Sequence, residues 1–91
     1  MLHIIKSLHS LELVTGFDAS HDAMLLVEDA IYAAISGHKM HDMLRDIKVY
    51  ALDADVMARG CTTKMSKTTK TISYDGFVEL TEQHSNIITW P

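Results

Sequence analysis

The stretch that decides the fold is Ile47-Lys-Val-Tyr-Ala-Leu-Asp-Ala-Asp-Val-Met-Ala-Arg-Gly-Cys61. Residues 47–52 are mostly β-branched or apolar, a pattern that predicts a buried strand. Residues 53–59 predict a short helix, and Gly60 is typical of the position just after a helix end. In α/β folds, ligands gather where the carboxyl end of a strand meets the next helix. Here Leu52 and Asp53 form that junction.

Strand-like and helix-like patterns alternate along the whole chain. We expect strands at 2–5, 23–27, 47–52, 71–74 and 86–90, and helices within 8–17, 29–36, 53–59 and 75–84. Asp29, Asp53 and Asp75 each stand at the start of an expected helix, where a carboxylate can cap free backbone N–H groups. The alternation predicts an α/β fold in three layers, with a mainly parallel five-stranded sheet and helices on both faces.

Size and composition bound the class of protein. The 91 residues predict a single domain spanning 1–91. Hydrophobic residues make up 47% of the chain, more apolar surface than a small sheet and short helices easily hide. We therefore expect association with other chains, or with further copies when the chain is isolated. The formal net charge of −4 argues against a general nucleic-acid-binding protein.

Positive charge is concentrated in one window without acids, which contains Arg59, Lys64, Lys67 and Lys70. One interpretation is a basic loop whose charges are simply solvated. The other is a docking edge for an acidic partner or for RNA. The sequence leaves both interpretations open.

The sequence also bears on the compartment. A single cysteine excludes an internal disulfide and fits a reducing environment. The opening residues Met1-Leu-His-Ile-Ile-Lys-Ser7 lack the basic region and long apolar core of a signal peptide. The apolar runs are too short to span a membrane. We therefore expect a soluble, cytoplasmic protein.

Cys61 is the candidate for sulfur chemistry. A persulfide-carrying cysteine needs a stabilised thiolate, which a helix N-terminus or nearby cations supply. Cys61 instead follows the C-terminal end of the expected helix, where the helix dipole disfavours an anion. Arg59 and Lys64 are cations close to it in sequence and would favour the thiolate. Two interpretations remain, a reactive thiol and an ordinary small side chain.

Neither the strand–helix junction nor the histidines indicate a bound group. Asp53 can accept the free N–H groups of its own helix and so fill the place that would suit an anion. His38 and His41 are three residues apart with Asp42 beside them, a spacing too common in polar loops to indicate a metal site. No phosphate-binding glycine motif follows any strand. We therefore expect no metal and no cofactor.

Three further residues are candidates for contacts with a partner. Met40 and Met43 lie in an expected polar connection at 38–46, where they form either a satellite core cluster or an adaptable contact surface. Trp90 either anchors the last strand or lies at an interface, where aromatic residues often serve as anchors.

Three segments together resemble the TusB/DsrH family. They are Met1-Leu-His-Ile4, the segment Ile47-Lys-Val-Tyr-Ala-Leu52 with Asp55-Val-Met-Ala-Arg-Gly60 after it, and Tyr74-Asp-Gly-Phe-Val-Glu-Leu-Thr-Glu-Gln-His84 with Trp90 near the end. The similarity extends over nearly the whole chain. It implies a small α/β/α domain of the flavodoxin-like, DsrEFH-like kind.

The resemblance also implies partners and a reaction. It implies assembly with paralogous TusC/DsrF-like and TusD/DsrE-like subunits as a dimer of heterotrimers, which relays persulfide sulfur to a TusE/DsrC-like acceptor protein. The sulfur ends either as 2-thiouridine at the tRNA wobble position or in sulfur oxidation. The persulfide cysteine of the D-like paralogue lies just after the third strand. The matching place here is about Leu52 and Asp53, so that role does not carry over, and Cys61 is not the equivalent position.

The leading hypothesis is a non-catalytic subunit of a sulfur-relay complex that serves thiolation of tRNA wobble uridine. One alternative is that Cys61 itself carries persulfide sulfur. Another is the DsrH-type subunit of a sulfur-oxidation complex. A weaker hypothesis is RNA contact through the segment from Arg59 to Lys70.

Overall fold

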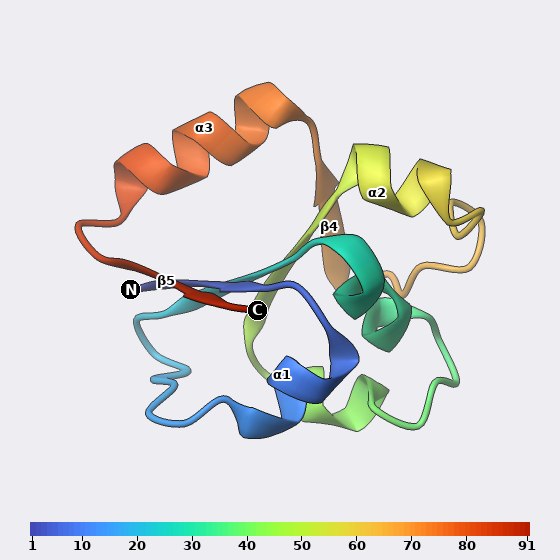
Figure 1. The fold of residues 1–91 in the computed structure, drawn as a ribbon, viewed down its shortest axis with the longest axis horizontal. Helices are drawn as coiled ribbons and strands as arrows, with labels where there is room; N and C mark the ends of the chain where they lie inside the picture. Colours follow the sequence, from blue (N-terminus) through green and yellow to red (C-terminus); the bar gives the residue numbers. More distant parts are fainter.

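Five parallel strands build the sheet, in the order β4-β3-β2-β1-β5. The computed structural model describes residues 1–91. The strands are β1 (Leu2–Ile5), β2 (Ala23–Leu26), β3 (Lys48–Leu52), β4 (Thr69–Ile72) and β5 (Ile87–Trp90). The predicted α/β class with a parallel five-stranded sheet is confirmed (Figure 1).

The fourth strand lies earlier than residues 71–74, where it was expected. β4 starts at Thr69, which pairs with Val49 of β3. Ser73 is no longer part of the strand, because its Oγ accepts a hydrogen bond from the backbone N–H of Gly76 (3.2 Å) and so caps the next helix. Tyr74 is the first residue of that helix. The strand and the helix therefore meet without an intervening loop.

Three α-helices and two 3-10 helices connect the strands. They are α1 (Leu8–Leu13), η1 (Glu28–Ala34), η2 (His41–Leu44), α2 (Asp53–Ala58) and α3 (Tyr74–Gln83). The α-helix expected at 29–36 is the 3-10 helix η1. Its buried residues repeat every third position, as Ala30 with Ala33 and Ile31 with Ala34, and a helix with three residues per turn places each pair on one side.

The predicted capping roles of Asp29, Asp53 and Asp75 are wrong. The residues that precede η1 and α2 are Val27 and Leu52, which offer no side-chain cap, and Ser73 caps α3. Each strand runs so directly into its helix that the aspartate falls inside the first turn. There a carboxylate is stabilised by the helix dipole rather than by a capping hydrogen bond.

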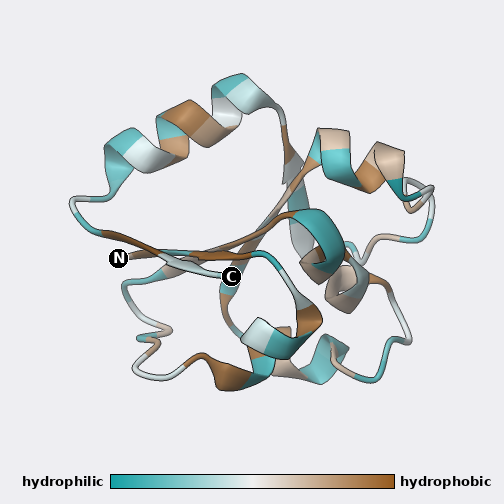
Figure 2. Ribbon diagram, viewed as in Figure 1, coloured by the Kyte–Doolittle hydropathy of each residue, from teal (hydrophilic) through white to brown (hydrophobic).

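The helices cover the two faces of the sheet unequally. Leu11 of α1, Ile31 of η1 and Val56 of α2 belong to one core cluster of 14 buried residues. On the opposite face, α3 alone contributes Leu80 to a cluster of four buried residues. Figure 2 shows apolar residues concentrated in the central strands. The prediction of helices on both faces is confirmed, with one face covered by a single helix.

A buried polar network ties the last strand to the first. The indole Nε1–H of Trp90 donates a hydrogen bond to Nδ1 of His3 (3.1 Å). Since an indole nitrogen only donates, Nδ1 must be unprotonated, and His3 therefore donates through Nε2–H to Oδ2 of Asp22 (3.1 Å). Asp22 also accepts from the amino group of Met1 (2.9 Å) and from the Asp18 backbone N–H (3.0 Å). Trp90 thus anchors β5 to β1.

We expect the Trp90→Phe variant to be less stable than the wild type by about 1–3 kcal/mol, because it leaves Nδ1 of buried His3 without a donor. Urea unfolding measures the change. The control is Ile87→Val on the same strand, whose exposed side chain should contribute less than about 0.5 kcal/mol. Equal losses for the two variants would contradict the role of the hydrogen bond.

We expect the free energy of unfolding of the Asp22→Asn variant to depend less on pH in the acid range than that of the wild type. The pKa of the Asp22 carboxyl lies below its ordinary value, first because the Asp18 N–H donates to it and next because the terminal ammonium does. The unfolded chain therefore binds a proton at Asp22 more readily than the folded chain does. The contribution of Asp22 to the free energy of unfolding is complete above the unfolded pKa and is lost as the pH falls below about 4. Unfolding free energies from pH 6 downwards measure it. The variant Glu12→Gln, at an exposed carboxyl, should keep the wild-type slope.

Candidate functional site

The fold has a topological switch point between the neighbouring strands β3 and β4. The helix after β3 is α2, which packs on the larger core cluster through Val56. The helix after β4 is α3, which packs on the opposite face through Leu80. In open parallel sheets, ligands bind outside the carboxyl ends of the strands at such a point. The junction of Leu52 and Asp53 singled out by the sequence lies there.

No cysteine lies at this junction. Leu52 is buried, and the hydroxyl of Ser73, at the end of β4, accepts from the N–H of Gly76. The first turn of α2 contains two carboxylates, those of Asp53 and Asp55. A thiolate or persulfide is anionic, and two carboxylates so close raise its free energy.

Asp55 also shapes the neighbouring strand end. Its Oδ2 accepts a hydrogen bond from the backbone N–H of Glu28 (2.8 Å), just after β2. Glu28 has a φ of 50°, in the left-handed region that non-glycine residues rarely adopt. The carboxylate of Asp55 therefore holds the carboxyl end of β2 against that of β3. The Asp55 carboxylate therefore has a structural role at the switch point.

Cys61 lies at the other end of α2 and is only 2% exposed. Its N–H donates to the Val56 carbonyl (3.0 Å), and the N–H of Gly60 donates to the Met57 carbonyl (3.0 Å). With a φ of 65° at Gly60, these two bonds form a Schellman motif, in which the residue after the glycine packs on the last turn of the helix. Sγ contacts the Arg59 carbonyl at 3.4 Å. The side chain of Cys61 thus has a packing role in the core.

The four cations of the basic window do not act as one group. Nε of Arg59 is 3.0 Å from Oδ1 of Asp29, and Nη1 is 3.9 Å from Oδ1 of Asp55, so acids surround this guanidinium. Lys64, Lys67 and Lys70 are exposed and form no ion pair. The loop between α2 and β4 is fixed to η1, for example through the Ser66 N–H and the Ala34 carbonyl (2.8 Å).

The two methionines of the 38–46 segment have different environments. Met40 is buried and belongs to the larger core cluster. Met43 is 47% exposed and borders an apolar pocket of about 150 Å³, together with Val14, Phe17 and Ile47. Of the two, Met43 is the one that a partner can reach.

No group of three or more His, Cys, Asp or Glu side chains is arranged to hold a metal ion. The ring of His38 instead accepts a backbone hydrogen bond from Met40 (3.1 Å). No helix has the length and apolar character needed to cross a membrane.

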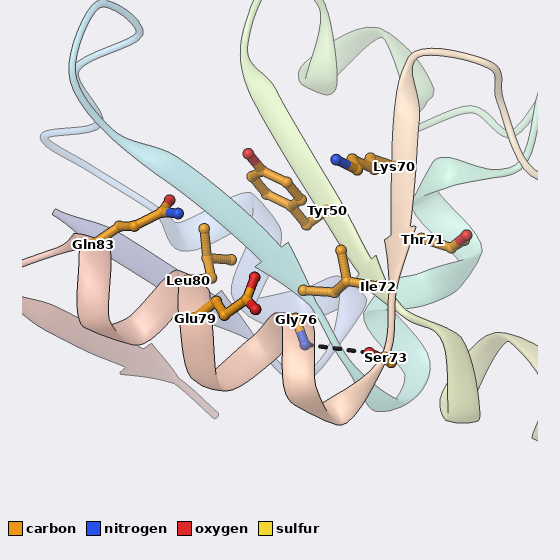
Figure 3. A pocket seen from close by; sticks show the side chains of 9 residues that line it. All are labelled: Tyr50, Lys70, Thr71, Ile72, Ser73, Gly76, Glu79, Leu80 and Gln83. Carbon is orange, nitrogen blue, oxygen red and sulfur yellow. Dashed lines mark hydrogen bonds between the residues drawn. The ribbon is translucent and has the colours of Figure 1, made fainter.

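Sequence reasoning missed a pocket of about 330 Å³ between α3 and the strands β3 and β4. Tyr50 and Lys70 project from the strands, and Glu79 and Gln83 project from α3 (Figure 3). No local pattern in the sequence signalled this pocket, because it depends on the strand order, which leaves α3 as the only helix on its face of the sheet.

Comparisons with known proteins agree with this fold. Residues 7–87 match the family model described as DsrH like protein. Two proteins named Protein TusB, from Escherichia coli strains ED1a and 536, are each 39% identical to the chain over 98 residues. These alignments cover 99% of this chain and 100% of each relative.

Two solved structures share the fold. The crystal structure of the ychN protein from E. coli gives a TM-score of 0.76 at 16% identity, covering 97% of both chains. The solution structure of Tm0979 from Thermotoga maritima gives 0.65 at 22% identity, covering 94% of this chain and 97% of that one. The family match over residues 7–87 and the 39% identity to the two TusB proteins show that this chain belongs to the TusB/DsrH family, and its parallel sheet agrees with that assignment.

Proposed function

We propose that this chain is a non-catalytic subunit of a heteromeric sulfur-relay complex that passes persulfide sulfur towards thiolation of tRNA wobble uridine. The observation that carries the proposal is the junction after β3, where the D-like paralogue has its persulfide cysteine. Here buried Leu52 occupies that place, and Asp53 and Asp55 follow it. The 39% identity to proteins named TusB favours the tRNA branch over sulfur oxidation.

The work of such a subunit is to assemble with its paralogues and to shape the site on them. The partners in this proposal are a TusC/DsrF-like and a TusD/DsrE-like subunit in a dimer of heterotrimers, with a TusE/DsrC-like protein as the sulfur acceptor. Several apolar side chains are exposed in the isolated chain and are available for such contacts. They are Met1, Leu13, Met43, Met57, Tyr74, Val78 and Ile87.

We expect co-expression with the C-like and D-like paralogues to give a complex that contains all three subunits, and native mass spectrometry determines its stoichiometry. Omitting this chain should reduce transfer of sulfur from a persulfide donor to the acceptor protein. Recovery of this chain only as a monomer, with normal sulfur transfer in its absence, would show that the proposal is wrong.

We expect Cys61 of the folded chain to gain no sulfur when it is incubated with a persulfide donor, because the thiol is buried under the Schellman motif. Intact-mass measurement tests this. Iodoacetamide should modify the thiol only after unfolding in urea, and the variant Cys61→Ser serves as the blank. A one-sulfur adduct on the folded wild type that Cys61→Ser lacks would favour the alternative of an active carrier.

A further inference from the structure

The side of the sheet that α3 covers is open above β3 and β4. Parallel sheets are normally covered by other elements on both faces. Here the only helix on that face contributes Leu80 to a cluster formed with β1 and β2, which leaves a groove of about 330 Å³ beside it. Tyr50 lies half-buried in this groove. A half-covered aromatic side chain of this kind is typical of a binding surface.

The groove has charges of opposite sign on its two sides. On the strand side, Lys70 points towards Tyr50 (Figure 3). Lys48 stands two positions before Tyr50 in β3 and so on the same face of the sheet. On the helix side, Glu79 points into the groove. None of these three exposed side chains forms an ion pair within the chain.

We propose that this groove, lined by Tyr50, Lys70, Glu79 and Gln83, binds a segment of a paralogous subunit that has a carboxylate on the side of β4 and a cation on the side of α3. This inference rests on the proposed function, because it places one of the contacts of that assembly.

The distribution of charge favours a protein segment over RNA. A polyanion would gain from Lys48 and Lys70 but would meet the carboxylate of Glu79 across the groove. A protein segment can present both signs within a few residues and can cover Tyr50 and Ile72 with apolar side chains. The groove is therefore complementary to a bipolar protein surface.

The test exchanges the two charges. Lys70→Glu, Glu79→Lys and the double variant Lys70→Glu/Glu79→Lys are compared in binding the paralogous C-like and D-like subunits, with dissociation constants from analytical ultracentrifugation. The double variant keeps the net charge of −4 but reverses the polarity of the groove. The control Glu12→Lys/Lys39→Glu also keeps the net charge, at two exposed residues outside the groove. Gln83→Trp fills the groove with an indole.

We expect each single variant, the double variant and Gln83→Trp to weaken binding by about tenfold or more, while the control binds like the wild type. Circular dichroism checks that each variant is folded. If the double variant and Gln83→Trp both bind like the wild type, the groove is not the interface, although the proposed function stands. If the wild type does not bind the paralogues, both proposals fail. Loss of a homodimer alone would show that a second copy fills the groove and would also overturn the inference.

Discussion

All other features of the molecule depend on one constraint, the connection of parallel strands by crossovers of a single hand. Each step from β1 to β2, β3 and β4 moves the chain one strand further in the same direction, so its connecting helices lie on one face. Only the step from β4 back to β5, beside β1, reverses direction, and it places α3 on the other face. The reversal creates the switch point at β3 and β4, and it leaves that side of the sheet with a single helix.

The same constraint explains why the switch point does not depend on particular residues. The topology brings the carboxyl ends of β3 and β4 together whatever residues occupy them. In this chain those residues pack, cap or hold a neighbouring strand, as Leu52, Ser73 and Asp55 do. The lone cysteine closes the far end of α2 instead. The architecture thus provides the geometry of a switch point, while these local residues serve the stability of the fold.

The strands and the parallel class could be predicted because apolar and β-branched runs alternate with polar helix starts. Hydrogen-bond partners could not. The capping role assigned to Asp53 failed because whether a strand leads straight into a helix, with Leu52 at the cap position, depends on tertiary packing. The buried state of Cys61 agrees with one of the two interpretations that the sequence allowed. The groove beside α3 could not be foreseen, since strand order is not encoded in local patterns.

The pairing of β1 with β5 has a consequence for how the chain folds. Leu2 pairs with Ile87, so almost the whole sequence must be closed into one loop before β1 has a neighbour on that edge. Until residues 87–90 have been synthesised, β1 exposes unpaired backbone groups, and buried His3 lacks the indole donor of Trp90. The ribosome-bound chain thus exposes one edge of β1, a strand that lies inside the sheet once β5 has paired with it.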